Sequence, residues 1–388
     1  MNIQRKILIP LVDRANYGRM RSVMAAVRDH PALDLQVMCT GTMVLKRFGN
    51  TIDEVIKDGF EVHSQVFMEL EGGIPLSMAK SLGFGVVEFT SELNRIQPDV
   101  VLLIGDRYEA LAMALAAAYM NIPIGHIQGG EVSGSIDESA RHAISKFAQF
   151  HFPATQRSAE YLYKMGEAEE RIFNVGCPVG DYILSLDSQL HKDVFCSGSG
   201  ADIDVDQGFN LVIFHPVTTE FGQEEQEVDE LLGALGELAY PTVFLWPNID
   251  AGADRISKCL RIFREKYQPA WLRFITNIDP VNFQKVLKRC TVAIGNSSSF
   301  VRDSTFSGTP VVLVGNRQKG REIGWNVLPV SVCKQDILKA VHWQMRHGRY
   351  ERDTVYGGGK AGKQVAEILS TVDLYVQKHL DYIHREAS

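Results

Sequence analysis

Short apolar runs alternate with amphipathic stretches along most of the chain. The runs Lys6–Val12 and Val100–Ile104 consist mainly of Ile, Leu and Val and predict buried strands. The stretches Tyr17–Asp29 and Leu76–Ile96 repeat apolar residues at helical spacing and predict helices. Strands with continuous aliphatic runs, separated by helices, are typical of a parallel sheet with helices on both faces. The fold class predicted by this pattern is therefore α/β.

The alternation is interrupted once and then resumes. Residues Leu186–Gly208 are polar, rich in Gly, Ser and Asp and without a clear period, which indicates a domain boundary. Further strands are expected on both sides of this boundary, at Leu33–Thr40, Glu61–Val66, Ile122–Ile127, Leu211–Phe214, Val243–Trp246, Leu272–Ile275, Val292–Ile294 and Val311–Val314. The pattern predicts two doubly wound Rossmann-like domains, residues 1–185 and 186–362, with a cleft between them. A C-terminal helix of about Lys363–Ile383, within residues 363–388, is expected to pack back on the first domain.

Composition and charge narrow the class of protein. The 388 residues, 45% of them hydrophobic, are enough for about two domains with large cores. The net charge of −7 and the scattered Lys and Arg argue against nucleic acid as a partner. The longest apolar run, Ala110–Ile127, is interrupted by polar residues and predicts a buried helix followed by a strand rather than a membrane span.

Two further features bear on the compartment. The apolar stretch near the N-terminus ends after about six residues at Asp13, too short for a signal peptide, so we expect a cytoplasmic protein. The six cysteines are widely spaced, with no CxxC pair, which favours reduced thiols over disulfides or a zinc site.

The stretch from Gly125 to His142, GHIQGGEVSGSIDESARH, concentrates groups that can transfer protons. It reads as the end of a strand, a glycine loop carrying Glu131, and a helix starting near Ile136. Ser135 and Glu138 have the spacing of a capping box. Asp137 and Arg141 then lie in the first turns of the helix, where an ordinary i,i+4 surface pair is an equally good interpretation.

Four more loops carry polar groups directly after predicted strands, where this kind of sheet binds its ligands. They are Asp13-Arg14, Gly105-Asp106-Arg107, His215–Thr219 and Gly295–Ser299. The last loop precedes a predicted helix and forms a candidate cradle for a diphosphate, with Arg14, Arg19 and Arg317 as cationic partners. The alternatives are structural: Asp106 and the serines as helix caps, and His215 as a satisfied core residue.

Several of these segments together resemble one known family. The motifs are GDRYEALA from Gly105, HIQGGEVSGSIDES from His126, HPVTT from His215, PNIDAG from Pro247, GNSSS from Gly295 and GNRQKGRE from Gly315. In this order they are similar to the UDP-N-acetylglucosamine 2-epimerases, and the GGEVSGSIDES loop resembles the hydrolysing branch, whereas non-hydrolysing members read more like EAGLR. The resemblance implies a glycosyltransferase-B-like fold. It also implies conversion of UDP-GlcNAc and water to UDP and N-acetylmannosamine, for sialic acid biosynthesis, without a cofactor or metal.

The resemblance also implies roles for individual residues. The catalytic candidates are Asp106, Gln128, Glu131, Asp137, Arg141 and His215. The candidates for binding UDP and the sugar are Arg14, Arg19, Arg107, Asn248, Ser297, Ser298, Asp303 and Arg317. Many relatives read HIEGGE where this chain has Gln128, and an amide cannot act as a general base. The C2 base is then either Glu131 or Asp137, or Gln128 orients the acetamido group; Asp303 stands where relatives often have Glu.

Other functions fit the same motifs. The same chemistry on UDP-2,4-diacetamido-2,4,6-trideoxyglucose is the first alternative, because that sugar differs only at C4 and C6. A retaining glycosyltransferase of the same fold and a catalytically inactive sugar-nucleotide sensor are more distant ones, since neither needs three carboxylates near the anomeric carbon. The expected partners are a UDP-sugar and further copies of the chain, in a homodimer or homotetramer, with no nucleic acid and no membrane.

Overall fold

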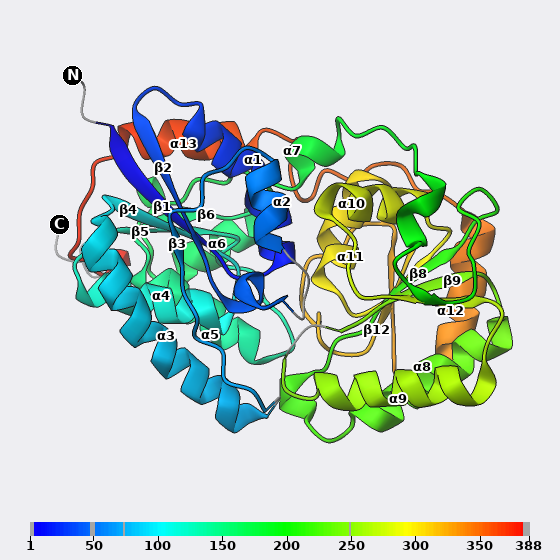
Figure 1. Cartoon of the computed structure of the whole chain (residues 1–388). Helices are drawn as coiled ribbons and strands as arrows, with labels where there is room; N and C mark the ends of the chain where they lie inside the picture. The colour runs from blue at the N-terminus through cyan, green and yellow to red at the C-terminus, as the bar shows by residue number, and fades with distance from the viewer. Residues whose placement is uncertain (1–3, 47–50, 73, 248–249, 383–388) are drawn as a thin grey trace.

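The computed structural model describes residues 4–46, 51–72, 74–247 and 250–382, and two parallel sheets carry the fold in these ranges (Figure 1). The first sheet has the strand order β3-β2-β1-β4-β5-β6. Its strands are β1 Arg5–Leu11, β2 Leu33–Cys39, β3 Ser64–Gln65, β4 Val100–Ile104, β5 Ile124–Ile127 and β6 Phe150–Phe152. In this doubly wound order the direction of winding reverses between β1 and β4, and ligands bind at the carboxyl ends of strands beside such a switch point.

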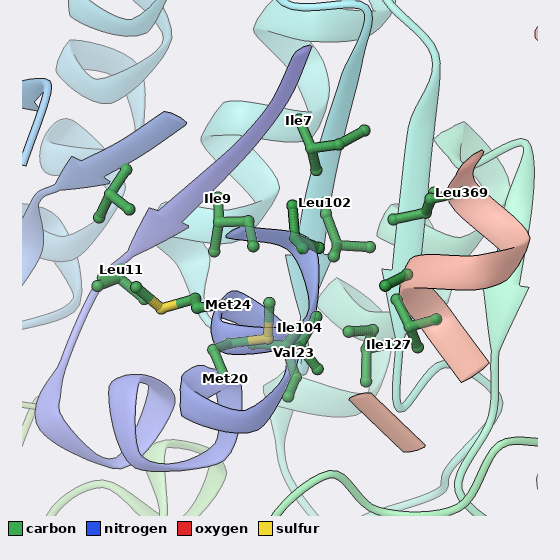
Figure 2. Close-up of a cluster of buried hydrophobic side chains, with 14 of the residues drawn as sticks. Ile7, Ile9, Leu11, Met20, Val23, Met24, Leu102, Ile104, Ile127 and Leu369 are labelled. Atoms are coloured by element: carbon green, nitrogen blue, oxygen red, sulfur yellow. The ribbon is translucent and has the colours of Figure 1, made fainter. Parts of the chain in front are cut away.

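Helices cover both faces of the first sheet. They are α1 Arg14–Arg28, α2 Thr51–Lys57, α3 Pro75–Ile96, α4 Tyr108–Tyr119, α5 Ile136–Phe147 and α6 Gln156–Lys164. Side chains alternate along β1, so that Ile7 and Ile9 pack on the face covered by α1, whereas Leu8 packs on the face covered by α3 and α4. Figure 2 shows the first of these clusters, to which helix α13 (Ala361–Thr371) adds Leu369.

The second sheet has the order β13-β12-β11-β8-β9-β10-β7, with its switch point between β8 and β11. Its strands are β7 Ser199–Gly200, β8 Asn210–Ile213, β9 Thr242–Leu245, β10 Leu272–Ile275, β11 Ala293–Gly295, β12 Val311–Val314 and β13 Val327–Val330. All neighbours pair in parallel except β7, which runs antiparallel to β10. Its helices are α7 Gly180–Ile183, α8 Glu224–Leu238, α9 Ala253–Tyr267, α10 Pro280–Arg289, α11 Ser298–Arg302 and α12 Lys334–His347.

The apolar pattern predicted most of these elements. The bounds of β4, β10 and β12 are those expected, and the fold class is confirmed. The division at residues 185 and 186 stays a prediction. Three expectations need correction, and each has a local cause.

The C-terminal helix ends at Thr371 instead of near residue 383, because Val372 takes extended backbone and the chain then continues without helical structure to Leu380. The strand expected at Glu61–Val66 pairs only at Ser64–Gln65. The predicted capping box does not form: Ser135 caps α5 by position, but its hydroxyl donates to Asp137, and Glu138 accepts from the backbone N–H of Ser133 at 2.6 Å.

Two predictions from composition can also be compared with the structure. All six cysteines are free; Cys39, Cys177 and Cys290 are buried and Cys196 is exposed. Within the ranges that the structure describes, each helix is too short or too polar to cross a lipid bilayer.

Candidate active site

Polar loops follow the carboxyl ends of the strands that lie beside the two switch points. After β4 the chain turns at Gly105, whose φ of +79° favours glycine, and then presents Asp106 and Arg107. After β8 it presents His215. The side chain of Asn296, which follows β11, forms two hydrogen bonds of 2.8 Å with the backbone of His215: its Oδ1 accepts from the N–H, and its Nδ2 donates to the C=O. The predicted loops therefore lie at the two places where this fold binds ligands.

Residues from both halves of the molecule line a cleft of about 730 Å³. Of the predicted site residues, the binding candidates Arg14 and Arg107 and the catalytic candidate His215 lie on its wall. A smaller pocket of about 120 Å³ is lined by Arg14, Arg19, His215, Ser297 and Asp303. Arg14 and His215 line both spaces, so the cleft and the pocket form one continuous binding region.

Arg141 connects two of the predicted carboxylate positions. Its Nη2 donates to Asp106 Oδ2, and its Nη1 donates to the backbone carbonyl of Glu131 at 2.7 Å. The residue is fully buried, although helix spacing alone would allow a surface pair with Asp137. Arg141 is therefore a buried partner of Asp106 and not half of a surface pair.

Glu131 lies in a cage of arginines. Its Oε2 is 2.9 Å from Arg302 Nη1 and 3.5 Å from Arg321 Nη2, and all three residues are buried. Glu131 belongs to the loop between β5 and α5, whereas Arg302 and Arg321 follow β11 and β12. These ion pairs consequently join the two halves of the molecule on one side of the cleft.

The three predicted carboxylates differ in acidity. Burial by itself would raise the pKa of Asp106, but the charges of Arg141 and three further arginines together outweigh it and lower that pKa. Burial would likewise raise the pKa of Glu131, and Arg302 and other arginines lower it. For Asp137, burial and the negative charge of Asp106 raise the pKa more than Arg317 lowers it. Asp106 and Glu131 are therefore ionised at neutral pH, and Asp137 is the carboxylate that most readily accepts a proton.

A chain of ion pairs continues from Asp137 across the cleft. Arg317 Nη2 lies 3.5 Å from Asp137 Oδ2 and 3.9 Å from Asp250 Oδ2. The other oxygen of Asp250 lies 2.8 Å from Arg107 Nη1. Arg107 also binds the buried carboxylate of Glu109 at 2.9 Å. Arg107, which lines the cleft, and Arg317 thus share Asp250 as a partner.

His215 and the serine loop lie next to these arginines. Burial, followed by the positive charge of Arg317, lowers the pKa of His215 to about 3, so the imidazole is neutral at neutral pH. Ser297 caps the short helix α11, accepting from the N–H of Ser299 at 3.4 Å. The capping alternative is therefore correct for Ser297, and Ser298 accepts from Arg302 at 2.9 Å.

Gln128 contacts Arg19, which lines the smaller pocket, and Asp303 lines that pocket itself. Gln128 is buried, with φ +63°; its Oε1 is 3.4 Å from Arg19 Nη1, and its Nε2 donates to Cys177 Sγ at 3.1 Å. Asp303 Oδ2 accepts from Gln284 at 2.7 Å, whereas its buried Oδ1 has no protein partner among the described residues. Because Asp303 lines the smaller pocket, this oxygen can accept a hydrogen bond from a ligand hydroxyl.

The sequence analysis did not single out Arg302, Arg321 or Asp250. Each has a signal in the sequence, since Arg321 and Asp250 belong to the quoted motifs GNRQKGRE and PNIDAG and Arg302 directly precedes Asp303. Asn248, predicted to bind the substrate, lies outside the described residues. In the described part of the chain, no group of three or more His, Cys, Asp or Glu side chains is arranged to hold a metal ion.

The two facing switch points define the class of protein. Two Rossmann-like sheets that meet at an arginine-lined cleft form the glycosyltransferase-B-like fold. The solved structure of the UDP-GlcNAc 2-epimerase of Methanocaldococcus jannaschii, in complex with UDP-GlcNAc and UDP, has this fold with a TM-score of 0.78. The match covers 94% of this chain and 99% of that chain at 16% sequence identity.

Sequence comparison then gives the family. The UDP-N-acetylglucosamine 2-epimerase family matches residues 25–370. The chain is 35% identical to a UDP-N,N'-diacetylbacillosamine 2-epimerase (hydrolyzing) of Legionella pneumophila, over 96% of this chain and 97% of that protein. It is 30% identical to a UDP-N-acetylglucosamine 2-epimerase of Neisseria meningitidis, over 96% of each. The chain belongs to the UDP-N-acetylglucosamine 2-epimerase family, as its motifs predicted.

Proposed function

We propose that this chain is a hydrolysing UDP-sugar 2-epimerase that releases UDP and a free 2-acetamido sugar inverted at C2. One observation carries the proposal. Burial and the charge of Asp106, which Arg141 keeps ionised, raise the pKa of Asp137; Asp106 follows β4, and Asp137 lies in the first turn of α5. Two carboxylates with opposite pKa shifts suit a reaction that needs one charged group and one proton carrier.

The reaction has two stages. In the first, the C1–O bond breaks, UDP leaves with the bonding electrons, and a proton leaves C2, which gives a 2-acetamidoglucal with a C1–C2 double bond. In the second, water adds its hydroxyl at C1, and a proton returns to C2 from the opposite face. Because the C2 hydrogen is weakly acidic, C1–O cleavage runs ahead and positive charge develops on the sugar ring.

Asp106 and Asp137 take different parts in this reaction. The ionised Asp106 stabilises the oxocarbenium-like charge, because a carboxylate held in place by Arg141 acts on charge that develops in the transition state. Asp137 removes the C2 proton, since a base works best when its pKa is closer to the working pH. Glu131 is less suited to that step, because Arg302 and Arg321 hold its carboxylate and lower its pKa.

The UDP part occupies the smaller pocket and its junction with the cleft. Arg14, which lines both spaces, and the neutral His215 lie where the diphosphate passes from one to the other. Arg317 completes the charge that compensates the leaving diphosphate. The Oδ1 of Asp303, which has no partner among the described residues, accepts a hydrogen bond from a ribose hydroxyl.

Two UDP-sugars are candidate substrates for this site. UDP-GlcNAc follows from the motifs and from the Neisseria relative. The 35% identity to the Legionella protein favours the second candidate, UDP-2,4-diacetamido-2,4,6-trideoxyglucose, which has an acetamido group at C4 and no hydroxyl at C6. Both have the same C1 and C2, so the mechanism above holds for either.

Proton NMR of the purified protein with each UDP-sugar in D2O tests the proposal. We expect UDP and a free C2-inverted sugar that carries deuterium at C2, because the proton that returns comes from solvent. The sugar that turns over with the higher kcat/KM identifies the substrate. Interconversion of two UDP-sugars without release of UDP would contradict hydrolysis, and intact starting material with both sugars would contradict the proposed function.

A further inference from the structure

His126 connects the first sheet with the loop that carries Asp106. It lies on β5 and is fully buried, and its Nδ1 is 3.0 Å from the hydroxyl oxygen of Ser145 on α5. Its Nε2 is 2.8 Å from the backbone carbonyl oxygen of Gly105. Both ring nitrogens therefore have a partner, and one of these partners directly precedes Asp106 in the chain.

The two partners decide which ring nitrogen of His126 carries the hydrogen. A carbonyl oxygen only accepts hydrogen bonds, so Nε2 is the donor to Gly105. Nδ1 is then the acceptor, and the hydroxyl of Ser145, which can donate or accept, donates to it. Burial lowers the pKa of His126 to about 3, so the ring is neutral at neutral pH and keeps this arrangement.

The turn at Gly105 needs such a restraint. Its φ is +79°, and glycine rotates more freely than other residues. Among the described residues, no atom beyond its chain neighbours lies within 4 Å of the place a Cβ would take, so packing restrains the turn little on that side. The carbonyl of Gly105 shares a rigid peptide plane with the N–H of Asp106. A hydrogen bond to that carbonyl therefore fixes the direction in which the chain enters Asp106.

Helix α5 joins this contact to the rest of the site. It presents Asp137, Arg141 and Ser145 at a spacing of four residues, so the three lie along one face of the helix. Arg141 holds the side chain of Asp106, and Ser145 orients the ring that holds the backbone in front of it. Asp106 is thereby fixed through both its side chain and its main chain relative to the helix that carries Asp137.

We propose that His126 is a positioning residue for Asp106: its Nε2–H holds the peptide plane between Gly105 and Asp106, and Ser145 keeps the ring in the tautomer that can donate. The inference rests on the proposed function, because it takes Asp106 as a catalytic carboxylate. His126 acts through Asp106 and not on the substrate. Its effect is on the rate, because a misplacement of about 1 Å in a catalytic group can cost about a hundredfold.

Steady-state kinetics of His126→Phe and His126→Gln with the UDP-sugar that turns over best test this role. Phenylalanine keeps a planar ring but cannot donate to Gly105, so kcat should fall by about tenfold or more, while KM and UDP affinity stay within a few-fold. Glutamine retains an N–H near the place of Nε2, so His126→Gln should recover most of the lost kcat. Ser145→Ala removes only the partner that orients the ring, and it should lower kcat less than His126→Phe does.

His151→Phe is the matched control. His151 is the register partner of His126 on the neighbouring strand β6 and is equally buried, but its ring binds Glu167 at 2.9 Å instead of the catalytic loop. It removes the same buried imidazole one strand further from Asp106. The kcat of this variant should stay within about twofold of the wild-type value.

A double-mutant cycle with Asp106→Asn shows whether His126 acts through Asp106. If it does, His126→Phe should lower kcat by less than about twofold once Asp106→Asn is present, because the effects of residues that act as a unit are not additive. A general structural defect would instead lower kcat by the same factor in both backgrounds.

The outcomes separate the inference from the proposed function. Near-normal kcat in His126→Phe, equal losses in His126→Phe and His126→Gln, or the same factor with and without Asp106→Asn overturns the positioning role. If His126→Phe does not fold, Ser145→Ala decides, and unchanged kcat in that variant overturns the role. Absence of UDP release by the wild type overturns the proposed function itself.

Discussion

The substitution Glu131→Gln tests whether Glu131 joins the two halves of the molecule. The carboxylate is buried between Arg302 and Arg321, at 2.9 and 3.5 Å, and both arginines come from the other half. Glutamine keeps the shape and one acceptor oxygen, but it leaves two buried guanidinium groups without a counter-charge. Removing one partner of a buried ion pair costs about 3 to 5 kcal/mol, and the retained acceptor places this variant near the lower end, about 3 kcal/mol.

Urea denaturation followed by tryptophan fluorescence measures this loss in the free energy of unfolding. Glu237→Gln is the matched control, because Glu237, in α8, pairs with Lys334 at 2.8 Å on the surface. Such a surface pair contributes about 0.5 kcal/mol. A loss below about 1 kcal/mol for Glu131→Gln, on the scale of that surface pair, combined with complete loss of turnover, would refute the structural role and return Glu131 to the list of candidate bases.

The effect of Glu131→Gln on the free energy of unfolding should depend on pH. The pKa of Glu131 is lowered in the folded protein, so its contribution to stability is fully present above its unfolded pKa of about 4.3. It is lost as the pH falls through the lower folded-state pKa. The stability difference between wild type and Glu131→Gln should therefore be constant from neutral pH to about 5. It should shrink as the pH falls below about 4.3.

Two further predictions concern catalysis. Asp106→Asn and Asp137→Asn should each lower turnover by about two orders of magnitude or more while UDP affinity stays within a few-fold, because both carboxylates act mainly in the transition state; near-normal kcat in either variant would remove that residue from the mechanism. Gln128→Glu should lower kcat at neutral pH and shift activity to higher pH, because it loses the hydrogen bond that Gln128 donates and places a new carboxylate near Glu131; a gain in kcat at neutral pH would show that this position holds the missing base.

The sequence by itself determined the local elements and the order in which they occur. Apolar runs such as Val100–Ile104 and Val311–Val314 are buried on both sides in a parallel sheet, so composition alone marks them as strands. The motifs determined the family, because several long segments in a fixed order carry more information than any single spacing. Strand β13 was missed, since its residues are only partly buried at the edge of the sheet and show no continuous aliphatic run.

The tertiary structure decided which charges meet. Helix spacing permits a pair between Asp137 and Arg141, yet Arg141 binds Asp106, and Asp137 lies next to Arg317, 180 residues along the chain. Glu131 finds its partners 171 and 190 residues away. Such contacts depend on how two switch points face each other across a cleft, and no local period encodes that distance. The sequence therefore supplied the candidate groups, and the packing of the two sheets assigned each carboxylate its arginines and, through them, its acidity.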